Sequence, residues 1–282
     1  MKSNLLDVDH VSKVFSGRGL FSRRVKHAVQ DVSFSLDADR PEVFTIIGES
    51  GSGKSTLAGM ILNTLRPTNG HIRFAGRDLA YIRSRKDRLA FMSRVQAIFQ
   101  NPFEAFNPLK PVDRYLFMAA EVFAGCRTKE ARETRVDDAL HKVGLSLAEV
   151  GGRYPHEMSG GQLQRIAIAR ALVSNPALIV ADEPVSMIDA SLRMTVINLF
   201  RMLRDELGVS IIYITHDLAT AYYISDRLII MQGGKVVEAG DARQILAAPQ
   251  HPYSLRLREA VLSVDGAWRG SRLDVDALES SS

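Results

Sequence analysis

One short segment constrains the fold of this chain more than any other. It covers residues 48–55 and reads Gly48-Glu49-Ser50-Gly51-Ser52-Gly53-Lys54-Ser55, which matches the phosphate-binding pattern G-x-x-x-x-G-K-[ST] at every fixed position. Residues 45–47 (Thr-Ile-Ile) precede it, as expected of a buried strand, and residues 55–62 follow it with helical composition. Glycines allow successive backbone N–H groups to turn toward an anion, and a helix N-terminus adds partial positive charge. The segment therefore predicts a nucleoside triphosphate site.

The polar side chains of this segment have separate roles in such a site. Lys54 brings a charge to the β- and γ-phosphates, and the Ser55 hydroxyl can ligate Mg²⁺. A flexible glycine and serine turn without a ligand is the alternative, but the flanking strand and helix disfavour it. The residues expected to contact the nucleotide here are Gly48, Ser50, Gly51, Ser52, Gly53, Lys54, Ser55 and Thr56.

The composition is that of a globular chain with ample core. Its 282 residues are 46% hydrophobic and 24% charged, and the net charge of +4 is spread along the chain, so binding to nucleic acid or a membrane surface is permitted but not required. The single cysteine, Cys126, cannot form an internal disulfide, which fits a reducing compartment. No signal peptide is apparent, and no segment reaches about eighteen uninterrupted apolar residues. We therefore expect any work at a membrane to depend on other subunits.

The N-terminal quarter has the alternating pattern of strands. Apolar and polar residues alternate over residues 5–15 and 28–36, and residues 43–47 form the strand before the phosphate loop. We expect a small antiparallel sheet laid against the nucleotide core. Residues 16–26 are basic and contain glycine, and we interpret them as an exposed hairpin loop in preference to a phosphate-steering element.

A second basic stretch covers residues 83–94. It contains five basic residues, namely Arg83, Arg85, Lys86, Arg88 and Arg94. Only one aromatic residue, Phe91, is interleaved for base stacking, so a charged exposed face is favoured over a nucleic-acid interface. We expect no nucleic-acid partner.

The remainder of the chain alternates between helices and strands. Residues 112–123 and 128–143 read as helices with no strand between them, which indicates an inserted helical lobe. Strands at residues 177–181 and 209–215 then alternate with helices from Ser159 and over residues 190–207. This alternation predicts a mostly parallel, doubly wound sheet.

Two further motifs carry chemistry. An apolar strand ends in Asp182 and Glu183, where the first acid can hold Mg²⁺ and the second can polarise the water that attacks the γ-phosphate. The run Met158-Ser159-Gly160-Gly161-Gln162 is a second glycine-rich helix start, and hence a second anion site. Since a nucleotide has one γ-phosphate, the second site is best explained by the nucleotide of a partner chain.

With Gln100 before these motifs and His216 after them, the set resembles the ATPase subunit of an ATP-binding-cassette (ABC) transporter over nearly the whole chain. The resemblance implies an α/β fold: a P-loop NTPase (RecA-like) core with an N-terminal antiparallel β subdomain and an inserted α-helical subdomain. It implies one domain over 1–282, in which 1–99 and 160–240 form the core with its β subdomain. Residues 100–159 would form the helical subdomain, and 241–282 a C-terminal extension.

The resemblance also implies the cofactors ATP and Mg²⁺ and assigns roles to single residues. Gln100 contacts Mg²⁺ or the attacking water, Asp189 communicates across a dimer, and His216 senses the γ-phosphate. Phe15 is the candidate for stacking on adenine, although it fits strand core as well. The metal contacts are then Ser55, Gln100 and Asp182, and the catalytic residues are Glu183, His216 and Gln100. Two cassettes lie head to tail, so that Ser159, Gly160, Gly161 and Gln162 of one face the phosphate loop of the other.

Residues 100–108, 154–157 and 250–254 are similar to the importer subgroup that takes up oligopeptides, dipeptides, nickel or oligosaccharides. This implies two transmembrane permeases, an extracytoplasmic solute-binding protein, a second cassette (identical or paralogous) and a place at the cytoplasmic face of the cell membrane. The His251-Pro252-Tyr253 run reads equally well as a plain turn before a helix. The alternative function is a soluble single-cassette ABC protein attached to an enzyme complex, such as one for carbon–phosphorus bond cleavage.

Overall fold

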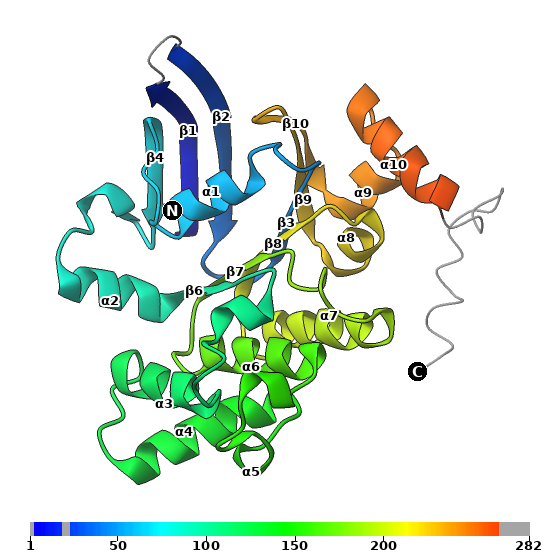
Figure 1. The fold of residues 1–282 in the computed structure, drawn as a ribbon. Helices are drawn as coiled ribbons and strands as arrows, with labels where there is room; N and C mark the ends of the chain where they lie inside the picture. Colours follow the sequence, from blue (N-terminus) through cyan, green and yellow to red (C-terminus); the bar gives the residue numbers. More distant parts are fainter. Residues whose placement is uncertain (1–2, 19–22, 265–282) are drawn as a thin grey trace.

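The computed structural model describes residues 3–18 and 23–264, and residues 1–2, 19–22 and 265–282 lie outside the described part. Two sheets organise the fold (Figure 1). The first has the order β2-β1-β4-β5, with β1 at Asn4–Arg18, β2 at Arg23–Asp37, β4 at Asn69–Phe74 and β5 at Arg77–Asp78. The second has the order β10-β9-β3-β8-β7-β6, with β3 at Val43–Ile47, β6 at Val95–Ile98, β7 at Leu178–Asp182, β8 at Ser210–Thr215, β9 at Arg227–Gln232 and β10 at Lys235–Asp241.

The helices follow in chain order. They are α1 (Lys54–Ile61), α2 (Arg85–Arg94), α3 (Asp113–Val122), α4 (Lys129–His141), α5 (Leu147–Val150), α6 (Gly160–Leu172), α7 (Ala190–Asp205), α8 (Leu218–Ile224), α9 (Ala242–Ala247) and α10 (Pro252–Val264). Short 3₁₀ turns lie at Leu79–Tyr81, Pro102–Ala105 and Pro155–Glu157. No helix among the described residues has the length and apolar character needed to cross a membrane.

The second sheet lies between two cores because alternate residues of its strands face opposite sides. In β7, Leu178 and Val180 pack toward the first sheet and α1, whereas Ile179 and Ala181 pack toward α6 and α7. Five of its strands are joined by parallel pairings and β10 is antiparallel at one edge. These mostly apolar strands are therefore covered on both faces, as parallel sheets require. The mostly parallel sheet expected from the sequence is confirmed.

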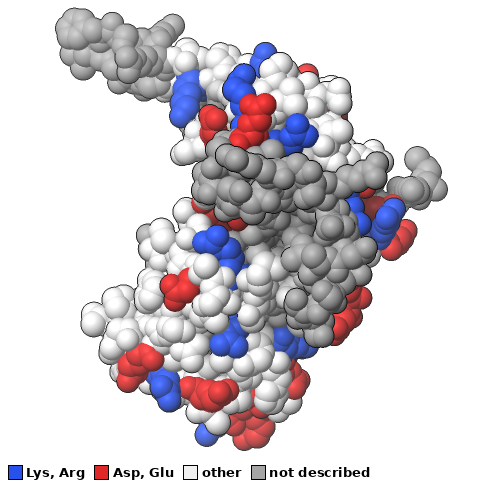
Figure 2. Space-filling view, turned by 90° about the vertical axis from the view of Figure 1, so that its right-hand side faces the viewer, with Lys and Arg blue, Asp and Glu red and all other residues white. Residues whose placement is uncertain are grey.

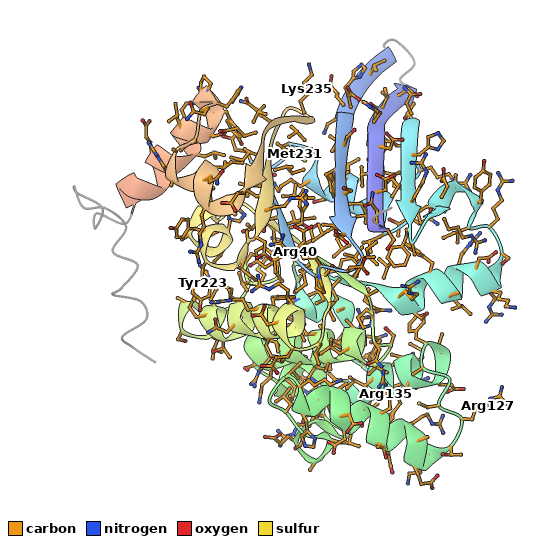
Figure 3. All side chains as sticks on the ribbon, turned by 180° about the vertical axis from the view of Figure 1, so that it is seen from behind. Arg40, Arg127, Arg135, Tyr223, Met231 and Lys235 are labelled. Carbon is orange, nitrogen blue, oxygen red and sulfur yellow. The ribbon has the colours of Figure 1, made fainter. Side chains whose placement is uncertain are left out.

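The helices α3, α4 and α5 lie together at the end of the molecule far from the β1–β2 hairpin (Figure 1). They share a core with α6, to which Leu116, Val136 and Leu163 contribute. The Arg135 side chain of α4 donates to the carbonyl oxygen of Val173, just after α6, at 2.7 Å (Figure 3). Thr128 caps α4 through the backbone N–H of Ala131, as its sequence position indicates.

One expectation was wrong in part. Residues 16–18 and 23–26, interpreted as loop, continue β1 and β2 as paired strands, with Ser16 opposite Val25 and Gly17 opposite Arg24. The backbone ladder of a long hairpin outweighs the polar composition there. Residues 19–22 of that stretch are outside the described part.

Most of the basic stretch at 83–94 forms the helix α2 (Arg85–Arg94), which its composition alone does not predict. Ser84 caps it by accepting from the backbone N–H of Asp87 at 3.0 Å. Its Lys and Arg side chains are exposed, which confirms a charged solvent face.

A different face of the molecule, which carries the C-terminal helices, is shown in Figure 2. Basic and acidic residues are interspersed on it.

Candidate nucleotide site

The phosphate loop runs from the end of β3 to the start of α1 and is packed tightly against neighbouring strands. Gly53 is the N-cap of α1 with φ 107°, a left-handed conformation that favours glycine. A Cβ atom at Gly53 would lie 2.3 Å from the carbonyl oxygen of Ala28 on β2, and one at Gly48 would lie 2.3 Å from that of Met231 on β9. Figure 3 labels Met231 on its strand. Both glycines are therefore required by close backbone contact as well as by conformation.

Lys54 is folded into this loop. Its Nζ donates to the carbonyl oxygens of Gly48 at 2.6 Å and Glu49 at 2.9 Å. Burial lowers the pKa of Lys54, and the nearby Glu183 and Asp182 carboxylates oppose that shift. The loop thus holds an ammonium group inside the curve where a triphosphate is expected.

Asp182 ends β7 beside the first turn of α1. Burial raises the pKa of Asp182 above that of an ordinary aspartate, and the nearby Ser55 hydroxyl opposes that shift. A carboxylate next to a hydroxyl is a pair of hard oxygen donors, which suits a Mg²⁺ ion that keeps waters and phosphate oxygens as its other ligands. Two of the three residues predicted for the metal, Ser55 and Asp182, therefore fit the ion.

Glu183 is held between two side chains from neighbouring strand ends. Its Oε2 accepts from Gln100 Nε2 at 3.2 Å, and its Oε1 lies 3.1 Å from His216 Nδ1. The strands β6, β7 and β8 are parallel neighbours, so the residues that follow them meet at one sheet edge. The sequence predicted these three residues individually, and the structure brings them together.

The observed hydrogen bond of Gln100 does not test its predicted metal contact. Its amide is bonded to Glu183, although Gln100 and Asp182 line one cleft with Phe99, Asn101, Ala105 and Met187. Metal contact by Gln100 thus stays a prediction.

The second glycine-rich motif begins α6 with a capping box. Ser159 Oγ accepts from the Gln162 N–H at 3.2 Å, and Gln162 Oε1 accepts from the Ser159 N–H at 2.9 Å. Gly160 and Gly161 stand in the first turn, where backbone N–H groups have no intrahelical acceptor. In the described part of the chain, no hydrogen bond links this motif to the phosphate loop.

The remaining predicted residues lie in varied settings. Asp189 is exposed at the N-cap of α7 without a capping hydrogen bond from its side chain. Phe15 is 41% exposed on β1 with Lys13 Nζ 5.2 Å from its ring centroid, so it is not strand core. Ser50 is exposed and Thr56 is partly buried. Their predicted contacts with the nucleotide stay predictions.

Ser52 is buried within the loop. Its Oγ has no hydrogen-bond partner among the described residues. A buried polar atom without a partner is unusual, and here it belongs to a loop whose sequence pattern binds phosphate.

A family model described as ABC transporter matches residues 29–186. The chain belongs to the ABC transporter family. Among its relatives in Bacillus subtilis (strain 168) is the oligopeptide transport ATP-binding protein OppF, which is 38% identical over 273 residues, or 97% of this chain and 87% of that protein. The oligopeptide transport ATP-binding protein AppF is 40% identical over 263 residues, or 92% of this chain and 79% of that protein.

Solved structures of similar fold are also cassettes. The ATP-binding cassette MJ0796, solved as a dimer in a post-hydrolysis state with ADP and phosphate, matches with a TM-score of 0.73 and 26% identity over 84% of this chain and 99% of that one. The cbiO1 protein of Clostridium perfringens, part of the transporter complex cbiONQ, matches with a TM-score of 0.73 and 26% identity over 94% of this chain and 98% of that one. The expected fold class is confirmed, and this ABC protein is an ATPase that binds ATP.

Sequence reasoning missed one residue at the loop. Tyr253 reaches the backbone of Glu49 from the C-terminal part of the chain. The His251-Pro252-Tyr253 run resembles a motif of the importer subgroup, but nothing in its pattern indicates a contact with the loop.

Proposed function

We propose that this ATPase powers an importer of peptides or of a related small solute such as nickel or an oligosaccharide. The observation that carries the proposal is the meeting of Gln100, Glu183 and His216 beside a phosphate loop, in a chain whose relatives are named for oligopeptide transport. The importer would contain two permeases, an extracytoplasmic solute-binding protein and a second cassette. The chain would lie at the cytoplasmic face of the cell membrane, bound through the permeases.

In the proposed site, the loop N–H groups and Lys54 receive the β- and γ-phosphates. Ser55 and Asp182 would hold Mg²⁺, which neutralises charge on the phosphate oxygens. Glu183 takes a proton from the attacking water, while Gln100 and His216 fix its carboxylate. Catalysis in this scheme consists of positioning and charge neutralisation, which is what phosphoryl transfer requires.

The second cassette would complete the site. The motif Ser159–Gln162 offers helix N–H groups and makes no hydrogen bond to the loop of its own chain, within the described residues. The dimeric cassette MJ0796 of similar fold supports pairing of two cassettes. Asp189, exposed at the start of α7, would contact the partner, and Phe15 would stack on adenine.

We assign the parts of the chain accordingly. Residues 1–99 and 160–240 would serve as the nucleotide-binding core with its β subdomain. Residues 100–159 would form the helical subdomain, and 241–282 the C-terminal extension. Gln100 stands where the core passes into the helical part, which suits a role in reporting ATP to the permeases.

The proposal is tested by purifying the tagged full chain from its native membrane and identifying its partners. We expect polytopic membrane proteins and ATP-dependent peptide uptake that Lys54→Ala abolishes and the unchanged gene restores. Recovery with soluble enzymes alone, and uptake unaffected by Lys54→Ala, would instead support the soluble single-cassette alternative.

A further inference from the structure

The C-terminal helix α10 touches the phosphate loop through one hydroxyl group. Tyr253, the second residue of α10, is 2% exposed, and its Oη accepts a hydrogen bond from the backbone N–H of Glu49 at 2.9 Å. The two residues are 204 positions apart in the sequence. Glu49 lies directly after Gly48, within the loop.

The contact continues to Lys54 through one peptide group. The N–H of Glu49 and the carbonyl of Gly48 belong to the same peptide unit, and in a trans peptide these two groups point to opposite sides. The described residues contain no cis peptide bond. The Gly48 carbonyl oxygen accepts from Lys54 Nζ at 2.6 Å. One peptide plane is therefore held by Tyr253 at one end and by Lys54 at the other.

The tyrosine ring is itself fixed by packing. It belongs to a small core that includes Ile47, the residue before the loop, and Leu218, the first residue of α8. The Tyr253 backbone N–H donates to His251 Nδ1 at 3.2 Å, and the Arg256 guanidinium lies 6.0 Å from the ring centroid. The hydroxyl is thus presented to the loop by a rigid element, since its ring has little freedom to move.

We propose that Tyr253 is a positioning residue for ATP binding, which acts through the Gly48–Glu49 peptide on Lys54. The inference rests on the proposed nucleotide site at the loop. It gives the His251-Pro252-Tyr253 run a role beyond a turn, and it makes α10 part of the nucleotide site. Loss of the hydroxyl frees the peptide to rotate, so the loop is less well organised for the triphosphate.

The test compares two tyrosine variants of the full chain. Tyr253→Phe removes the hydroxyl but keeps the buried ring. Tyr115→Phe is the matched control, because Tyr115 Oη also accepts a backbone N–H, that of Asn107, at 2.8 Å, outside the phosphate loop. We expect Tyr253→Phe to raise the KM for ATP about three- to tenfold with kcat within about twofold, in line with the loss of one hydrogen bond. Tyr115→Phe should change both by less than about twofold.

The split between KM and kcat separates positioning from folding. A variant that is only less well folded has fewer active molecules, so kcat falls while KM stays constant. That outcome, or an unchanged KM, would overturn the inference. In a Lys54→Ala background, Tyr253→Phe should cause no further loss of affinity for a fluorescent ATP analogue, because its effect passes through Lys54.

The same measurements separate this inference from the proposed site. If Lys54→Ala weakens nucleotide binding and Tyr253→Phe does not, only the role of Tyr253 is wrong. If Lys54→Ala leaves binding intact, the proposed phosphate site itself is wrong.

Discussion

His216 Nδ1 lies 3.1 Å from Oε1 of Glu183, and the two residues follow neighbouring parallel strands. Glu183 has φ 46° and donates its backbone N–H to the carbonyl oxygen of Ile214 on β8 at 2.9 Å. A positive φ is uncommon for a residue with a side chain, and here the hydrogen bond to β8 holds it. The turn after β7 thus aims the Glu183 carboxylate at the end of β8, where His216 stands.

This pairing predicts that His216→Ala slows hydrolysis without weakening ATP binding. We expect kcat to fall about 10²-fold, as for loss of one group that orients a catalytic centre, with ATP affinity within about threefold. The control is His141→Ala, since His141 is an exposed histidine beside Asp137 on α4. Measurement of steady-state hydrolysis and of ATP binding checks the prediction, and a matched loss in both would contradict it.

The partly buried carboxylate of Asp182 predicts a pH-dependent difference in stability. Burial raises the pKa of Asp182 in the folded chain above the ordinary value of 3.8. At a pH between these two values, the folded state binds more protons than the unfolded state. Ionised Asp182 therefore destabilises the nucleotide-free fold at neutral pH, and stability is regained as the pH falls through the raised pKa. Asp182→Asn should melt at a higher temperature than the unchanged protein at pH 7–8, while losing Mg²⁺-dependent hydrolysis.

Melting curves across a pH series check this sign. The difference between Asp182→Asn and the unchanged protein should shrink as the pH falls through the raised pKa, because the native carboxyl group then becomes protonated. A difference that grows as the pH falls would contradict the assignment.

The packing of the phosphate loop predicts unequal effects at two glycines. Gly51 and Gly53 both have positive φ, but a Cβ at Gly51 meets nothing within 4 Å, whereas one at Gly53 lies 2.3 Å from the Ala28 carbonyl oxygen. Gly51→Ala should cost about 1 kcal/mol of stability from backbone strain alone. Gly53→Ala should cost about 3 kcal/mol, because β2 must also move away from the loop. Denaturant unfolding measures both, and equal effects would show that the close contact is absent.

The head-to-tail arrangement predicts complementation between two inactive chains. Lys54→Ala disables the loop of its own chain, and Ser159→Arg blocks the motif that would serve the partner's loop. In a mixed dimer of this chain, one site carries both changes and the other carries neither. Mixing the two variants should therefore restore roughly the activity of single intact sites. If each variant stays as inactive in the mixture as alone, ATP does not lie between the two chains of that dimer.

The sequence predicted the parts of the site whose chemistry is local. The phosphate loop, the capped start of α6 and the acids after β7 each need fixed residue types at fixed spacing, so a short segment is sufficient to predict them. The meeting of Glu183 with Gln100 and His216 follows from parallel strands whose carboxyl ends share an edge.

Other features depend on contacts between distant segments. The β1–β2 hairpin extends through a basic stretch because strand pairing supplies hydrogen bonds that composition does not reveal. The short helix α8, capped by Asp217, has too few residues for a recognisable period. The Tyr253 contact with Glu49 joins two residues that are 204 positions apart, and no local pattern encodes it.

The most direct test of the account is the fate of ATP bound to Glu183→Gln. The variant keeps the shape of the side chain but cannot accept a proton from water, so single-turnover hydrolysis should fall about 10²- to 10⁴-fold with ATP binding retained. Glu206→Gln, at an exposed position after α7, is the control and should behave as the unchanged protein. Bound nucleotide recovered from Glu183→Gln as intact ATP would agree with Glu183 as the general base, whereas ADP formed at the normal rate would contradict it.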